Sequence, residues 1–262
     1  MKIGVGYRWE LAGWIASSPP GVDCLEITAE HFYKGGEAEL FALSEKFHLY
    51  VHGLGLSLGT PGPLDQARLR RFARISKAAS AEWVSEHVAF TRTTECDLGH
   101  LNPIPATHEM LEVLAAHARE VAGLCDRPLL LENITSHVRL PGELSEPAFL
   151  NELCRRAGCG LLLDVTNLFI NSQNHGFDPA NWLSQIEPGL IRQLHIVGYS
   201  RRYGRYTDDH AQPVQQELLD LARAVIGRSP VEAIILERDA DFPAPEVMTA
   251  EIAKLLSLCE RN

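Results

Sequence analysis

Histidines, carboxylates and carboxamides recur in this sequence at the points where short apolar runs end. In LLLEN, three leucines run directly into Glu132 and Asn133, although an unpaired buried charge is strongly destabilising. The same pattern selects His52, His87, Glu132, Asp164, His195, Glu237 and Asp239. The loop expected after Asp164 adds Asn167, and the loop expected after the run that holds His195 adds Asp208 and His210. Nitrogen and oxygen donors without a thiolate suit iron, manganese, zinc or similar divalent ions. The set therefore indicates a metal site.

The carboxylates in this set need cations among them. Their mutual repulsion would otherwise raise their pKa values. Two or three divalent ions would keep them ionised, and carboxylates can bridge ions that lie about 3.5–4 Å apart. Such ions would supply the partner that Glu132 needs. In TDDH, the outer side chains Asp208 and His210 could grip one ion.

The remaining histidines have a simpler interpretation, because a single histidine is more often structural than metal-bound. We assign surface, core or supporting positions to His31, His48, His100, His108, His117 and His137. His175, in NHGFDP, is a candidate for lining the site. The basic and aromatic segment RRYGR holds Arg201, Arg202 and Arg205. It is either a solvated loop or a substrate anchor beside the site.

Alternating strands and helices must position these side chains. Apolar runs predict strands over 3–7, 23–28, 48–52, 83–87, 128–133, 160–165, 191–197 and 232–239. Helical periodicity covers 37–46, 64–80, 107–123, 146–157, 213–226 and 245–259, with less regular pieces near 9–17 and 179–186. This alternation is typical of βα units and a parallel sheet.

One (β/α)₈ TIM barrel, a single domain over 1–262, fits the length and the elements. Its active site would lie at the carboxyl ends of the strands, where the polar residues stand. A doubly wound open sheet is the competing fold. No GxGxxG follows a strand to support it.

Composition and charge limit which classes of partner and which cellular location we expect for this protein. The net charge of −10 opposes non-specific attraction to nucleic acid or anionic membranes, although a local basic patch can survive in an acidic protein. No apolar run reaches the roughly 18 residues of a membrane span, and the N-terminus does not resemble a signal peptide. We therefore expect a cytoplasmic protein. The 6 cysteines form no CxxC pair, which argues against a disulfide framework or a thiolate zinc site.

The combined motifs resemble one known family. They are VHGLGLSLGT, VSEHVAF, LLLENITS, GCGLLLDVTNL, NHGFDP, LHIVGY, DDHAQPV and LERDADFP. From about residue 3 to 250 the chain resembles the multinuclear non-haem iron-dependent oxidative enzymes, (β/α)₈ barrels of the xylose isomerase/AP endonuclease type that modify cysteines in ribosomally made peptides. The resemblance places that family's ligands on the residues already selected.

This resemblance implies two or three iron ions in mixed Fe(II)/Fe(III) states, with O₂ as co-substrate. It also implies a ribosomal precursor peptide containing a cysteine, and a small companion protein that binds its leader. Glu132 and Asp239 become candidate catalytic residues, with Asp239 either a ligand of a third ion or a proton acceptor. The candidate substrate contacts are Arg201, Arg202, Arg205, Asn133 and His175.

Several reactions stay open. The family includes β-carbon excision from a C-terminal cysteine, as in 3-thiaglutamate biosynthesis, and oxazolone/thioamide formation, as in methanobactin biosynthesis. The VHGLGLSLG and NHGFDP segments favour the first. Barrel AP endonucleases share the ligand order, but they have histidine where this chain has Asn167, and the acidic charge disfavours a DNA partner. A sugar isomerase-like or non-catalytic metal-binding barrel is a third possibility.

Overall fold

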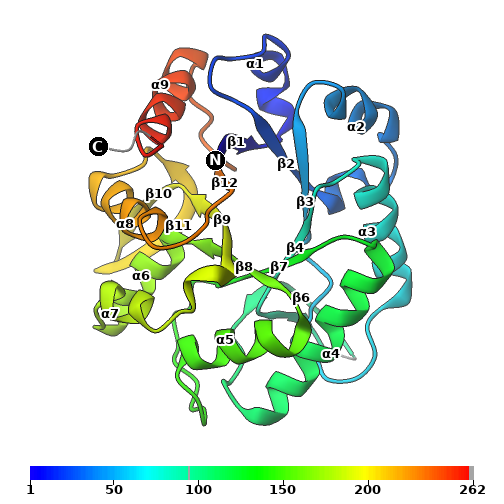
Figure 1. The fold of residues 1–262 in the computed structure, drawn as a ribbon, viewed down its shortest axis with the longest axis vertical. Coiled ribbons are helices and arrows are strands. Elements are labelled where there is room, and N and C mark those ends of the chain that lie inside the picture. The colour runs from blue at the N-terminus through cyan, green and yellow to red at the C-terminus, as the bar shows by residue number, and fades with distance from the viewer. Residues whose placement is uncertain (94, 260–262) are drawn as a thin grey trace.

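Parallel strands close into a barrel in the computed structural model, which describes residues 1–93 and 95–259 (Figure 1). The strands run in the order β1-β12-β9-β8-β7-β4-β3-β2. Their bounds are β1 Lys2–Gly6, β2 Cys24–Thr28, β3 His48–His52, β4 Val84–His87, β7 Leu129–Glu132, β8 Gly160–Asp164, β9 Ile191–Ile196 and β12 Ala233–Leu236. They match the eight predicted segments, except that β12 ends before 237–239. The TIM-barrel prediction is confirmed.

Helices surround the barrel (Figure 1). Their bounds are α1 Ala12–Ala16, α2 Glu37–Ser44, α3 Gln66–Ala78, α4 His108–Cys125, α5 Glu146–Ala157, α6 Val165–His175, α7 Pro179–Ser184, α8 Gln216–Ile226 and α9 Pro245–Leu256, with 3₁₀ turns η1 Trp9–Leu11, η2 Ala29–Phe32 and η3 Pro188–Leu190. The predicted helices are present with shifted ends.

Helix α6 is a correction to the sequence analysis, which placed a loop after Asp164. Its sequence VTNLFINSQNH is rich in Asn, Thr and β-branched residues, which have low helix propensity. The Asp164 side chain caps the helix by accepting a hydrogen bond from the Asn167 backbone N–H at 2.7 Å. This cap at the end of β8 and packing on the barrel override the weak local preference.

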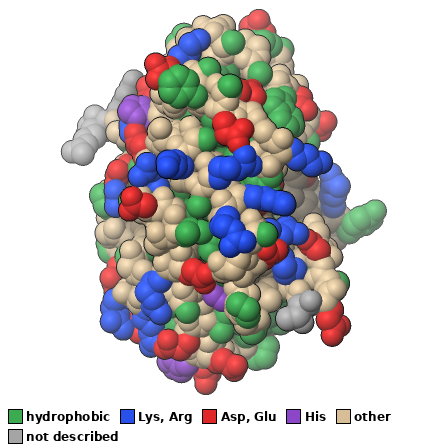
Figure 2. Space-filling model, turned by 90° about the vertical axis from the view of Figure 1, so that its right-hand side faces the viewer, with side chains coloured by type: hydrophobic (Ala, Val, Ile, Leu, Met, Phe, Trp, Pro, Cys, Tyr) green, Lys and Arg blue, Asp and Glu red, His purple; other side chains and the backbone are tan. Residues whose placement is uncertain are grey.

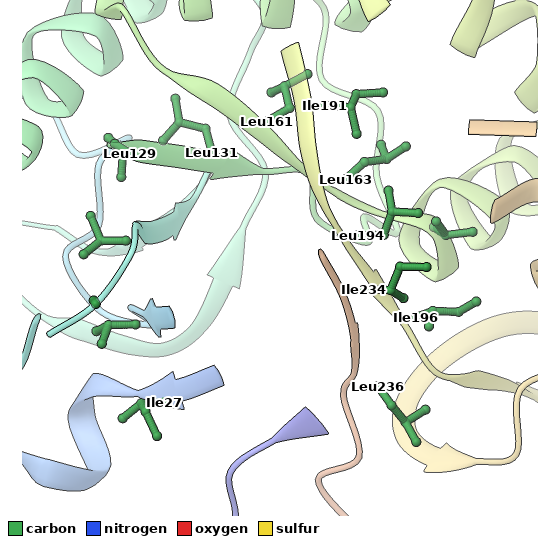
Figure 3. Packing of buried hydrophobic residues seen from close by; sticks show 14 of the residues in the cluster. Ile27, Leu129, Leu131, Leu161, Leu163, Ile191, Leu194, Ile196, Ile234 and Leu236 are labelled. Atoms are coloured by element: carbon green, nitrogen blue, oxygen red, sulfur yellow. The ribbon is translucent and has the colours of Figure 1, made fainter. Parts of the chain in front are cut away.

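Successive residues of each barrel strand point alternately toward the surrounding helices and into the barrel interior. Leu129 and Leu131 of β7 belong to the large core between strands and helices, part of which Figure 3 shows. The alternate residue Leu130 joins Tyr50 and Trp83 inside the barrel, where these two rings stack with centroids 4.0 Å apart. Because side chains alternate between faces, Glu132 follows Leu130 on the interior face.

Two antiparallel hairpins stand outside the barrel sheet. They are β5 Phe90–Arg92 with β6 Asp97–Asn102, and β10 Gly198–Arg202 with β11 Arg205–Gln212. The second hairpin corrects the expectation of a loop over 201–210. Tyr203 and Gly204 have φ values of 52° and 80°, as a two-residue hairpin turn requires. The polar character of β11 hid this strand from a search for apolar runs.

Surface charge is unevenly distributed over the molecule. Helix α3 presents the exposed side chains of Arg70, Arg71, Arg74 and Lys77. Figure 2 views the side on which α2 and α3 lie, and it shows a band of Lys and Arg side chains there. Among the described residues, no helix has both the length and the apolar character needed to cross a bilayer.

Candidate metal centre

Strand register brings the candidate ligands together at the carboxyl ends of the barrel strands. His87 of β4 lies opposite Glu132 of β7, and Asp164 of β8 lies opposite His195 of β9. These side chains, together with His52 at the end of β3, are buried. Within the part of the chain that the structure describes, the ligand atoms form three overlapping groups.

The first group consists of His52, His87 and Glu132. The Nε2 atoms of both histidines lie 3.5 Å from Oε2 of Glu132. The Nδ1 atom of each ring contacts a neighbouring side chain. His52 Nδ1 lies 2.9 Å from Ser85 Oγ, and His87 Nδ1 lies 3.2 Å from Glu86 Oε1. These contacts direct both Nε2 atoms toward the same carboxylate oxygen.

The second group consists of Glu132, Asp164, His195 and Glu237. Nδ1 of His195 lies 3.3 Å from Oε1 of Glu132 and 3.0 Å from Oε2 of Glu237. Glu132 thus presents one oxygen to each of the first two groups, which is the arrangement of a bridging carboxylate. Nε2 of His195 faces away from the group, 2.7 Å from Oε1 of Glu26.

The third group consists of His210, Glu237 and Asp239. Nδ1 of His210 lies 3.2 Å from Oδ2 of Asp239 and 3.8 Å from Oε2 of Glu237, so Glu237 connects the second and third groups. Arg8 donates to Oδ1 of Asp239 from Nε at 2.7 Å. Its Nη2 lies 2.5 Å from the same oxygen.

Asp208 lies beside His210, and the expectation that the two grip one ion stays a prediction. Its Oδ2 lies 2.6 Å from Nε2 of His210, and among the described residues it belongs to none of the three groups. In this structure Asp208 therefore contacts the His210 ring directly. His210 has φ of 49°, a conformation uncommon for residues other than glycine, and such outliers concentrate at functional sites.

The donor atoms fit divalent cations. Within the described residues, buried atoms that have no neighbour in hydrogen-bond geometry include His52 Nε2, Glu132 Oε2, Asp164 Oδ2, His195 Nδ1 and His210 Nδ1. All five residues belong to the three groups. Each unpaired buried polar group costs about 1–3 kcal/mol, so their convergence without a cation would be destabilising. Nitrogen and oxygen donors around shared carboxylates suit iron, manganese or zinc.

The protonation of the metal-free cluster follows from burial and from neighbouring charges. Burial alone would lower the pKa of His87, but the Glu132, Glu86 and Glu237 carboxylates raise it to about 9. Burial, with the nearby His87 and His195, lowers the pKa of His52. Burial raises the pKa of Asp164, and Glu132 and Asp208 add to the rise. Ions would have to displace protons from His87 and Asp164 in order to bind.

Asn167 and Asn133 have partners within the fold. Asn167 lies in the first turn of α6, where its Oδ1 accepts a hydrogen bond from Thr135 Oγ1. Its Nδ2 donates to the backbone O of Asn133 at 3.2 Å. The Asn133 amide is bonded at both ends to the Asp164 backbone, at 3.0 and 2.9 Å. Asn133 therefore aligns β7 with β8, while Asn167 lines the cavity that opens above the candidate ligands.

A cavity of about 550 Å³ opens above the ligands; we call it the mouth. Arg202 lines the mouth and pairs with Asp209 at 3.3 Å. Arg201 lies over the Tyr206 ring, 4.7 Å from its centroid, and Arg205 donates to the backbone O of His137 at 3.1 Å. These two arginines are exposed on the same hairpin but do not line the mouth.

His175 lies in a different cavity from the one expected. It lines a second cavity of about 500 Å³, and its Nε2 lies 2.7 Å from the backbone O of Ser136. The expectation that His175 lines the metal site is therefore corrected by the position of α6, whose last residue is His175.

Four supporting residues were not predicted from the sequence: Arg8, Glu26, Glu86 and Gln193. Gln193 Nε2 donates to Glu26, and Trp83 Nε1 donates to Gln193, so a chain of hydrogen bonds runs from the barrel interior to His195. Strand alternation in CLEIT and IRQLHI could have placed Glu26 and Gln193 on the interior face. Arg8 lies in the loop after β1 and offered no such signal.

A protein-family model and several curated relatives match this chain over the full barrel. Residues 2–260 match the model of a family described as RiPP precursor modification enzyme MbnB/TglH/ChrH. A UPF0276 protein of Chromobacterium violaceum is 35% identical over 254 residues, covering 96% of this chain and 92% of that protein. A UPF0276 protein of Caulobacter vibrioides is 33% identical over 255 residues, with coverage of 95% and 91%.

More distant solved structures share the fold. Endonuclease IV from Thermus thermophilus superposes with a TM-score of 0.64 at 14% identity, covering 98% of this chain and 100% of that one. D-psicose 3-epimerase from Clostridium cellulolyticum gives 0.65 at 12% identity, with coverage of 97% and 89%. At these identities the likeness establishes the barrel type alone.

Proposed function

Because the chain belongs to the MbnB/TglH/ChrH family of RiPP precursor modification enzymes, we propose that it oxidises a cysteine residue of a ribosomally synthesised peptide, using iron and O₂. The observation that carries this proposal is the set of three overlapping ligand groups joined by Glu132 and Glu237. Shared carboxylates hold ions close enough to act on one substrate together.

The proposed iron ligands are His52, His87 and Glu132 in the first group, Glu132, Asp164, His195 and Glu237 in the second, and His210, Glu237 and Asp239 in the third. Asn167 and Asp208 line the mouth beside them and are proposed as further ligands. When bound, two or three iron ions in mixed Fe(II)/Fe(III) states would supply O₂ activation and a site for the substrate thiolate, since coordination deprotonates a thiol.

If only two ions bind, Asp239 is instead suited to accept a proton at the edge of the centre. Its side chain is 41% exposed, whereas the Glu237 side chain is 7% exposed. Arg8 holds Oδ1 of Asp239, and Oδ2 faces His210 Nδ1. A proton taken from the substrate could therefore pass from Asp239 to solvent. Glu132 instead is buried and acts through charge, by holding two ligand groups together.

Two outcomes for the cysteine are chemically balanced with one O₂. In β-carbon excision, the side-chain CH₂ leaves with both oxygen atoms as formic acid, and the sulfur becomes attached to the α-carbon. In oxazolone/thioamide formation, the peptide loses four hydrogen atoms and O₂ is reduced to two waters. We favour excision from a C-terminal cysteine, because this chain contains the VHGLGLSLG and NHGFDP segments associated with that type.

The proposed partners are a precursor peptide and a small companion protein that binds its leader. Arg202 lines the mouth, and Arg201 and Arg205 stand on the same exposed hairpin. Guanidinium groups bind carboxylates in a two-pronged geometry, so this hairpin could anchor the peptide terminus. A companion could bind an extended leader as an added strand.

Oxygen uptake combined with mass spectrometry tests this function. The iron-loaded protein, with and without the products of neighbouring genes, is given a cysteine-containing precursor, an abasic DNA duplex and a panel of sugars. We expect oxygen uptake only with the precursor, and loss of either one CH₂ unit or four hydrogen atoms from its cysteine. Strand cleavage of the DNA without oxygen uptake would establish a hydrolase instead, and sugar interconversion would establish an isomerase.

A further inference from the structure

The second cavity has no role in the metal centre, although it lies directly behind one wall of the mouth. The segment 132–138 separates the two spaces. Glu132, Thr135 and His137 line the mouth, whereas Ser136 and Val138 line the second cavity. One segment of chain therefore contributes to both.

This dividing wall is fixed to the rest of the fold. Asn171 of α6 accepts from the backbone N–H of Ser136 at 2.9 Å and donates to the backbone O of Ile134 at 2.8 Å. His175 contacts the backbone O of Ser136, and Arg205 of the hairpin donates to the backbone O of His137. With anchors on both sides, the wall holds the two cavities at a constant separation.

Apolar side chains form one large part of the second cavity. Its lining includes Ile104, Leu144, Phe149, Phe177 and Trp182, from several different elements. A volume of about 500 Å³ lies within the range of small-molecule sites. It is large enough for an aromatic side chain and its flanking backbone.

The charged groups of this cavity already have partners. Glu146 accepts from Trp182 Nε1 at 2.9 Å, and Asp178 caps α7 by accepting from the Ala180 backbone N–H at 3.0 Å. Arg139 lies over the Phe177 ring, 5.5 Å from its centroid. A charged occupant would compete with these contacts, so the lining favours a neutral, apolar one.

The rim of the cavity leaves apolar side chains in water. Val138 and Leu140 are 56% and 44% exposed, and both line the cavity. Exposed apolar surface around a concavity commonly marks a binding site. An occupant of the cavity would cover these two side chains.

We propose that the second cavity is a specificity pocket that receives an apolar side chain, preferably an aromatic one, of the same peptide whose cysteine enters the mouth. This inference rests on the proposed peptide substrate. The two cavities lie on either side of the segment 132–138. Packed layers of a fold lie about 10 Å apart and an extended peptide advances about 3.4 Å per residue, so we expect the pocket residue roughly two to four residues from the reacting cysteine.

Binding of synthetic peptides to the iron-loaded protein without oxygen tests the pocket. Two series carry cysteine at the C-terminus or at the N-terminus, with Phe or Ala placed one to six residues away in a Gly/Ser background. Burial of a phenylalanine side chain should tighten binding roughly 10- to 100-fold over alanine. We expect this preference in one series, confined to about two to four residues from the cysteine.

Leu140→Asp should abolish the preference for Phe, because it places a charge on the pocket rim. Val138→Asp is the second variant, and Leu124→Asp is the matched control. Leu124 is 48% exposed and lies near the end of α4, outside the lining of either cavity. All three variants should retain the wild-type iron content and melting temperature.

Three results would overturn the proposal. The first is an equal preference for Phe over Ala at all positions, and the second is no such preference in either peptide series. The third is a preference for Phe that survives in both the Leu140→Asp and Val138→Asp variants. Oxygen uptake with the same peptides reports the proposed oxidation separately. Peptides that bind with the expected preference and consume no oxygen would support the pocket while rejecting the oxidase function.

Discussion

Glu26→Gln tests whether the hydrogen-bond chain behind His195 controls the metal centre. In the wild type, two donors converge on the Glu26 carboxylate, which accepts from Gln193 Nε2 and lies 2.7 Å from His195 Nε2. Gln193 in turn accepts from Trp83. Glu26 is 3% exposed. Glutamine has nearly the same size as glutamate, but its amide N–H₂ is a donor. It would face either Gln193 Nε2 or His195 Nε2, each of which needs an acceptor.

The expected magnitude follows from these contacts. One buried donor would be left without an acceptor, at a cost of about 1–3 kcal/mol. For a chain of this length, that lowers the melting temperature of the metal-free protein by roughly 2 °C per kcal/mol. Loss of the carboxylate behind a metal-bound histidine should also weaken metal binding by about 10- to 100-fold.

Chelator competition and thermal unfolding measure the two effects. Glu82→Gln is the control, because Glu82 pairs with Lys2 at 2.7 Å with its side chain 33% exposed, outside the ligand groups. A surface pair of this kind contributes only about 0.2–1 kcal/mol. The control variant should therefore bind metal like the wild type.

A second substitution can restore the lost contact. Adding Gln193→Glu to Glu26→Gln exchanges the two groups, so that the amide at position 26 donates to the new carboxylate and accepts from His195. Trp83 keeps an acceptor. Metal affinity should recover most of its loss. Wild-type metal affinity in Glu26→Gln alone would refute the claim that this residue orients His195.

Further expectations concern protons, the hairpin histidine and substrate affinity. The pKa of His87 is raised from 6.5 to about 9 in the metal-free fold. The contribution of protonated His87 to the free energy of unfolding is therefore full below pH 6.5 and is lost as the pH rises through 9. Metal affinity, measured by calorimetry, should increase over the same pH interval because the ring loses its proton. His210→Ala should lower iron content more than Asp208→Ala, with little change in metal-free melting temperature, and global unfolding of either would show a structural role instead. Replacing the three hairpin arginines with alanine should raise the apparent KM of peptide oxidation more than it lowers iron content, and an unchanged KM would exclude them from substrate binding.

The barrel and most residues of the three candidate ligand groups could be predicted because both depend on local pattern. Leu129 to Glu132 illustrates the point: a strand buried on both faces reads as an apolar run, and its polar end marks the catalytic edge of the barrel. The same reasoning found His52, His87 and Asp164 without knowledge of register, since parallel strands all end at one edge.

The parts that could not be predicted depend on tertiary contacts. Helix α6 forms although its sequence has weak helix propensity, because Asp164 caps it. Its position carries His175 away from the mouth. The support that Arg8 gives to Asp239 joins residues 231 positions apart, and no periodicity encodes such a contact. The role of Asp208 likewise depends on the hairpin that turns it toward His210.

Metal analysis of Glu132→Ala tests the central claim most directly. The claim is that Glu132 joins two ion positions, with one oxygen 3.5 Å from the Nε2 atoms of His52 and His87 and the other 3.3 Å from Nδ1 of His195. Protein purified without oxygen should contain two or three iron ions per chain and consume O₂ with a cysteine peptide. Glu132→Ala should lose most of that iron and the oxygen uptake. Stoichiometric zinc with full activity in the wild type, or wild-type iron content in the variant, would contradict the shared-carboxylate iron centre.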